Sequence, residues 1–219
     1  MRAIFTAELE ALGQDLVAMS RLVEAAIDGA GTALLEADLA RAETVIADDP
    51  TIDAIERDLD ERCVMLLAQQ QPVARDLRTV VTALRMSASL ERMGDLARHI
   101  AEVARLRYPG RAIPSDVEPL FRQMHDAAVR VSREVTTVLE SRDLGLAEEL
   151  REDDDLLDRL HAETFDATLG GAHHLTPQQI VDVTLVGRYY ERFGDHGVSV
   201  ANRITYLVTG DLADEHGGP

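Results

Sequence analysis

The stretch ERMGDLARHI, residues 91–100, recurs at residues 191–200 as ERFGDHGVSV. Both copies contain the signature Glu-Arg-apolar-Gly-Asp, at Glu91 to Asp95 and at Glu191 to Asp195. On a helix, residues four apart lie on one face with their Cβ atoms roughly 5 to 6 Å apart, so each copy would present two carboxylates side by side. A glycine inside a helix costs roughly 1 kcal/mol relative to alanine, so its recurrence in the same setting requires a reason. The doubled signature therefore indicates an internal repeat.

Apolar residues recur at steps of three and four along nearly the whole chain, as they do on the buried face of an amphipathic helix. We expect Pro50 to kink the second helix rather than to begin a new one, and Thr176 and Pro177 to cap and open the last helix. No segment shows a convincing strand alternation, so the sequence predicts an all-α protein. The expected helices cover about residues 5–34, 39–68, 72–106, 114–140, 144–169 and 177–209.

The six helices divide into two groups of three. Pro72 and Pro177 each open the third helix of a group, and an Asp-x-x-x-Asp pair lies on each preceding helix. The sequence therefore predicts two tandem three-helix bundles in a six-helix protein. The first repeat covers residues 1–110, the second covers residues 111–210, and residues 211–219 are expected to form a disordered tail.

Composition limits the classes of protein to which this chain can belong. The 219 residues are 46% hydrophobic, and 40 acidic residues against 22 basic ones give a net charge of -18. Such a charge repels a phosphate backbone, so nucleic acid is not expected as a partner. A single cysteine and an acidic start without a long apolar segment favour the cytoplasm. No apolar run approaches the roughly 20 residues that span a bilayer, so we expect no direct membrane insertion.

Two interpretations of the acidic pairs are open. In the first, the pairs are solvated or neutralised by arginine in a very acidic chain, and the glycine serves the close approach of two helices. In the second, carboxylates from two adjacent helices converge on a metal ion, whose charge offsets the repulsion between neighbouring anions. The candidate ligands are then Asp49, Asp53, Glu91 and Asp95 in the first repeat and Asp154, Asp158, Glu191 and Asp195 in the second.

The histidines give weaker indications of a metal site. His99 follows Asp95 by four residues and could add a nitrogen ligand, but the equivalent position of the second repeat is Ser199. We therefore expect His99 to be structural or exposed. We expect the same of His173 and His174, which fall in a predicted loop without a partner at ligand spacing.

From about Phe5 to Leu207 the chain resembles the PhoU family of phosphate-signalling proteins, on the basis of the doubled signature and the Asp-x-x-x-Asp pairs. The resemblance implies a cytoplasmic, often dimeric regulator that connects a phosphate ABC transporter to a sensor histidine kinase. It also implies clusters of iron or zinc held by the acidic motifs, which correspond here to the eight candidate ligands. The family tends to have asparagine where this chain has His99 and Ser199.

The resemblance predicts a negative regulator of the phosphate-starvation (Pho) response and of phosphate uptake, rather than an enzyme. Its expected partners are the ATPase subunit of the phosphate ABC transporter, the sensor histidine kinase and a second copy in a homodimer, with peripheral association to membrane complexes. The alternative is a metal-binding helical-bundle protein, either a di-metal oxidoreductase or a regulator of a different transporter. Such oxidoreductases use Glu-x-x-His on two helices, and the nearest approach in this chain is the single step from Asp158 to His161.

Overall fold

The computed structural model describes residues 2–170 and 174–211. Within these residues the chain forms six α-helices and no strand, which confirms the predicted all-α class and the number of helices. The predicted tail lies outside the described residues except for Asp211, and so does His173. The helices are α1 (Arg2–Glu36), α2 (Leu39–Gln70), α3 (Ala74–Arg107), α4 (Glu118–Ser141), α5 (Leu144–Leu169) and α6 (Pro177–Thr209).

The helix ends follow local capping chemistry. The Asp38 carboxylate accepts a hydrogen bond from the backbone N–H of Arg41 at 3.0 Å and begins α2. Thr176 and Gln179 form a capping box at the start of α6, as the Thr-Pro sequence predicts. Pro50 lies inside α2, which continues through it instead of ending there. The third helix begins two residues later than expected, because Val73 is extended and precedes the first helical turn.

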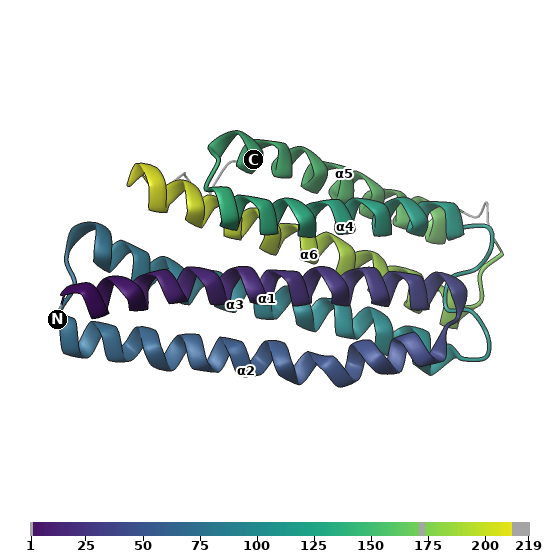
Figure 1. Cartoon of the computed structure of the whole chain (residues 1–219). Helices are drawn as coiled ribbons and strands as arrows, with labels where there is room; N and C mark the ends of the chain where they lie inside the picture. Colours follow the sequence, from purple (N-terminus) through teal and green to yellow (C-terminus); the bar gives the residue numbers. More distant parts are fainter. Residues whose placement is uncertain (1, 171–173, 212–219) are drawn as a thin grey trace.

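The two groups of three helices lie side by side with their long axes running in the same general direction (Figure 1). α2 is the outer helix of the first repeat and α5 that of the second, while α1 and α3 of one repeat pack against α4 and α6 of the other. Buried side chains of both repeats, among them Ile27, Ile100, Phe121 and Tyr190, form one continuous hydrophobic core. The predicted tandem bundles are therefore fused along their length.

An approximate twofold relation connects the repeats, and it fixes which residues are equivalent. Positions of α1 and α2 correspond to positions 105 residues later in α4 and α5, whereas α3 and α6 correspond at an offset of 100. At the α1–α4 contact, a methyl group added at Gly31 would lie 2.1 Å from Nδ1 of His125. The equivalent pair, Ser20 and Thr136, shares a hydrogen bond of 3.0 Å. This contact thus occurs twice in the α1–α4 interface, once as a glycine against a histidine and once as a serine against a threonine.

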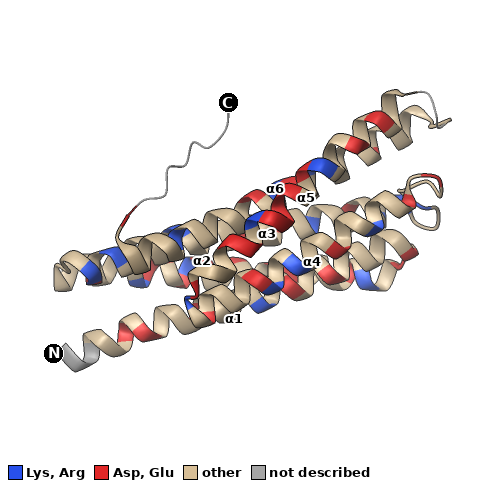
Figure 2. Cartoon of the chain, turned by 90° about the horizontal axis from the view of Figure 1, so that it is seen from above, with Lys and Arg blue, Asp and Glu red and all other residues tan. Residues whose placement is uncertain are grey.

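Acidic positions occur along the whole length of the bundle, with basic ones between them, rather than in a single charged face (Figure 2). Cys63 is a buried free thiol on α2, and burial raises its pKa to about 11. Among the described residues, no helix combines the length and apolarity needed to cross a bilayer.

Candidate functional site

The glycine of each signature lies where two helices come closest. A methyl group added at Gly94 of α3 would lie 3.0 Å from Cδ1 of Ile52 and 3.8 Å from Oδ1 of Asp49, both on α2. In the second repeat the approach is tighter, since a methyl group at Gly194 would lie 2.3 Å from Oδ1 of Asp154. A side chain at position 194 would therefore displace that carboxylate. The glycines allow an aspartate of one helix to lie against the signature of the next.

The first acidic set consists of Asp49 and Asp53 on α2 with Glu91 and Asp95 on α3. Arg98, one turn after Asp95, bridges the two helices within this set. Its Nε lies 2.8 Å from Oδ2 of Asp49, and its Nη2 lies 2.6 Å from Oδ1 of Asp95. The sequence-predicted carboxylates are thus brought together, with a cation of the chain itself between two of them.

A second arginine adds to the neutralisation of the first acidic set. Nη1 of Arg92 lies 3.1 Å from Oδ2 of Asp95, and its Nε lies 3.5 Å from Oε2 of Glu91. Burial raises the pKa of Asp49, which Arg98 opposes, and burial with the charge of Asp95 raises the pKa of Glu91. These are the effects expected of carboxylates that are crowded and half-covered but still paired with guanidinium groups.

The second acidic set consists of Asp154 and Asp158 on α5 with Glu191 and Asp195 on α6. Here Val198 occupies the position of Arg98, so the bridging cation is missing. Arg188 forms an ion pair with Glu191, one turn away on the same helix. Two buried oxygens, Oδ1 of Asp154 and Oε2 of Glu191, have no hydrogen-bond partner among the described residues. The two sets therefore have the same carboxylates and different cations.

The missing arginine changes the electrostatics of the second acidic set. Burial raises the pKa of Asp154 to about 7, and the charges of Asp158 and Asp195 act in the same direction. Burial also raises the pKa values of Asp158, Glu191 and Asp195. Carboxylates with raised pKa values resist ionisation, and a cation from outside would stabilise their charged forms.

The two sets differ in how well they fit a metal ion. As the side chains stand, no three histidine, cysteine, aspartate or glutamate groups in the described part of the chain are arranged to hold one. In the first acidic set Arg98 already occupies oxygens of Asp49 and Asp95, so that set does not fit a metal. In the second acidic set the free oxygens of Asp154 and Glu191 are donors of the kind that hard and borderline cations prefer. Its residues fit such an ion in their chemistry.

His99 and Ser199, each four residues after a signature aspartate, face the contact between the repeats. The His99 ring lies 5.3 Å from the Tyr189 ring, centroid to centroid, and Oγ of Ser199 lies 3.4 Å from Oγ of Ser89. His161 packs in a similar way against Phe165 of its own helix, at 5.1 Å. His99 thus has the packing contact expected of a structural residue.

The difference in cations between the two acidic sets was not predicted from the sequence. The residue three positions after the signature aspartate is Arg98 in one copy and Val198 in the other, and one helical turn places it next to that aspartate. Comparing the residues that follow the two signatures would have revealed this difference. Arg98 is therefore the cation by which the first acidic set differs from the second.

Transferring the arginine to the second repeat should change the dependence of stability on pH. The pKa of Asp154 is about 7 when folded against an ordinary 3.8, so the folded state binds more protons between those values and stability falls as the pH rises through them. Val198→Arg should lower the pKa of Asp154 and reduce this fall. At about pH 8, with a chelator present, we expect the free energy of unfolding to rise by on the order of 1 kcal/mol after allowance for partial exposure. Near pH 4 we expect little change.

Urea unfolding at both pH values measures this effect, and two further variants serve as references. Val208→Arg adds the same charge to an exposed position of α6 and should leave the pH dependence unchanged. Arg98→Val removes the cation from Asp49 and Asp95 and should make the loss of stability with rising pH steeper. Identical pH dependence in Val198→Arg and Val208→Arg would show that position 198 does not act on the acidic set.

Comparison with known proteins agrees with this architecture. The PhoU domain model matches twice, at residues 16–104 and 121–204, which are the two repeats. The chain is 40% identical to "Phosphate-specific transport system accessory protein PhoU homolog 2" of Mycobacterium tuberculosis, over 96% of this chain and 99% of that protein. It is 39% identical to homolog 1 of Mycobacterium leprae, over 98% and 97%.

A solved structure extends the similarity to three dimensions. The crystal structure of PhoU from Pseudomonas aeruginosa superposes with a TM-score of 0.84 at 31% identity, covering 94% of this chain and all of that one. The match of the family model to both repeats, together with relatives of this identity over nearly their full length, shows that the chain belongs to the PhoU family.

Proposed function

We propose that this chain is an accessory protein of phosphate transport and a negative regulator of the phosphate-starvation response and of phosphate uptake. It acts in the cytoplasm as an adaptor between the ATPase subunit of a phosphate ABC transporter and a sensor histidine kinase, at the membrane only through these partners. The observation that supports this proposal best is the full-length identity of about 40% to proteins named as phosphate-specific transport system accessory proteins. The role is regulatory rather than catalytic, and it is exerted by docking.

The surface of the molecule supports a role in docking. Phe165 and Leu169 near the end of α5 are exposed, and so are Val181 and Leu185 near the start of α6. The α2–α3 hairpin exposes Val64, Met65, Val73 and Leu77 at the opposite end of the molecule (Figure 1). Exposed apolar residues grouped in this way are typical of surfaces that contact other proteins. One such surface would suit the expected homodimer and the other a partner.

We also propose that the second acidic set binds a metal ion. Of the eight ligands predicted from the sequence, only Asp154 and Glu191 have a buried oxygen without a hydrogen-bond partner among the described residues, and both belong to this set. Asp158 and Asp195 complete the set as exposed carboxylates. Iron or zinc bound there would supply positive charge that holds α5 against α6, as Arg98 does between α2 and α3. In the first acidic set that role belongs to Arg98, and no metal is proposed for it.

Metal content measures this part of the proposal directly. Purified chain, equilibrated with iron or zinc and desalted, should retain metal, and Val198→Arg should lose it because the guanidinium occupies the same oxygens. Val208→Arg, with the same charge, should retain the parent's amount. Arg98→Val should gain binding at the first acidic set. Equal metal content in the parent, Val198→Arg and Val208→Arg would contradict the assignment of the second acidic set.

The regulatory function is tested in the native host. Deletion of the gene, together with any paralogue, should raise alkaline phosphatase activity in phosphate-rich medium, because the starvation response would no longer be repressed. Complementation with the intact chain should restore low activity. Activity that stays low in the deletion strain would contradict the proposed negative regulation.

A further inference from the structure

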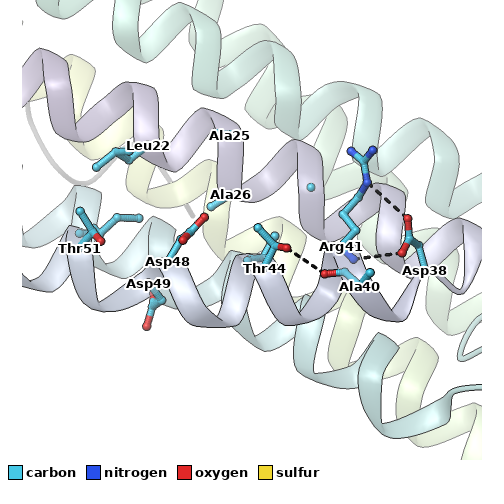
Figure 3. Close-up of a pocket in the computed structure, with 13 residues that line it drawn as sticks. Leu22, Ala25, Ala26, Asp38, Ala40, Arg41, Thr44, Asp48, Asp49 and Thr51 are labelled. Atoms are coloured by element: carbon cyan, nitrogen blue, oxygen red, sulfur yellow. Dashed lines mark hydrogen bonds and ion pairs between the residues drawn. The ribbon is translucent and has the colours of Figure 1, made fainter.

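A groove of about 700 Å³ lies between α1 and the first half of α2 (Figure 3). Its floor consists of small and apolar side chains from both helices, and polar groups of α2 line its side. Gly29 keeps the helices close at this point, since a methyl group there would lie 2.8 Å from Cγ2 of Val45. The apolar part is formed by Leu22, Ala25, Ala26, Gly29, Val45 and Ile52.

One carboxylate in the groove has no cation. Asp48 is exposed, points toward Ala26 and has no ion-pair partner among the described residues (Figure 3). Asp49 points to the other side of α2, where Arg98 holds it at 2.8 Å. Arg41 lies about two helical turns from Asp48, roughly 10 Å along the axis, and its Nε is 3.7 Å from Oδ2 of Asp38. Asp48 therefore provides the uncompensated charge of the groove.

In the second repeat, the aspartate equivalent to Asp48 has an arginine partner. Asp153 is equivalent to Asp48, and Arg130 of α4 is equivalent to Ala25. Nη2 of Arg130 lies 2.8 Å from Oδ1 of Asp153, and its Nε lies 2.9 Å from Oδ2, which is a two-point contact. This contact leaves the Asp153 side chain only 19% exposed. An arginine thus crosses from the first helix of the repeat to the aspartate of the second.

Other positions of the groove are also larger in the second repeat. Gly29 corresponds to Glu134, whose pKa is raised to about 7 by burial and by Asp153 beside it. Ala26 corresponds to Val131, which is fully buried. The first repeat therefore has the same aspartate but neither the arginine nor the larger side chains that surround it in the second.

We infer that the groove binds an arginine-bearing helical segment of a partner protein, an inference that rests on the proposed adaptor function. The guanidinium takes at Asp48 the place that Arg130 takes at Asp153, and apolar residues of the segment cover Leu22, Ala26 and Val45. The net charge of -18 favours the approach of a basic segment over an acidic one.

Two surface substitutions separate this inference from general electrostatic attraction. Ala25→Arg gives the first repeat the arginine that the second repeat has at Arg130. Because Ala25 is exposed at the groove, the new side chain should occupy the groove and pair with Asp48. Asp48→Asn removes the anchoring charge. Matched controls on exposed positions of α5 are Ala162→Arg and Glu163→Gln, which change the net charge by the same amounts. All four variants should fold, and circular dichroism checks this.

The probe is a fluorescent synthetic helix of about 15 residues with a leucine–alanine face and one central arginine, paired with the same peptide carrying neutral citrulline. Fluorescence anisotropy should show binding to the full chain, weakened roughly fivefold to tenfold by citrulline. Asp48→Asn should abolish the difference between the peptides, and Ala25→Arg should abolish binding. Ala162→Arg and Glu163→Gln should bind like the parent. No binding at about 1 mM, or equal binding of both peptides, would overturn the inference.

A second copy of the chain is the other candidate occupant. If Ala25→Arg converts a dimer to a monomer in size-exclusion chromatography while Ala162→Arg does not, the groove is a homodimer interface and the inference is wrong. The peptide assay is independent of regulation in the cell. If peptide binding fails while gene deletion still raises phosphatase activity, the groove assignment fails and the proposed function stands.

Discussion

The close contact of two helices at a glycine is the constraint on which the rest of the structure depends. Gly94 and Gly194 let α3 and α6 approach the preceding helices so closely that Asp49 and Asp154 lie against the signature carboxylates. The gain is tight packing in each repeat, and the cost is the repulsion and desolvation of several negative charges at one place. The first repeat supplies Arg98 as a cation between its helices, and the second holds all four of its carboxylates with raised pKa values.

The repeats use their arginines in complementary ways. In the first repeat Arg98 neutralises the acidic set, and Ala25 leaves the groove between the first two helices open. In the second repeat Val198 leaves the acidic set without a bridging cation, and Arg130 fills the position equivalent to the groove. Each repeat thus pairs one of two neighbouring aspartates with an arginine of its own and leaves the other without one. We propose different ligands for the two available sites, a metal ion in the second repeat and a partner arginine in the first.

Helical periodicity was sufficient to predict most of the fold. The limits of α5 and the cap at Thr176 were predicted correctly, because both depend on neighbouring residues. The fusion of the two bundles was not predicted, since contacts such as Gly31 with His125 join positions remote in sequence. The candidate carboxylates are brought together as expected, but neither the role of Arg98 nor the groove was identified. The difference between Arg98 and Val198 is visible in the aligned repeats, but the contact of Arg98 with Asp49 and the presence of the groove depend on how the helices pack.

The second acidic set lacks the cation between its two helices that the first acidic set has in Arg98. The most direct test is an NMR titration of the side-chain carboxyl carbon of Asp154 in metal-free protein. The account predicts a titration midpoint at about 7, because burial and the neighbouring carboxylates disfavour ionisation. A midpoint near the ordinary 3.8 would show that this carboxylate is already compensated and would contradict the account.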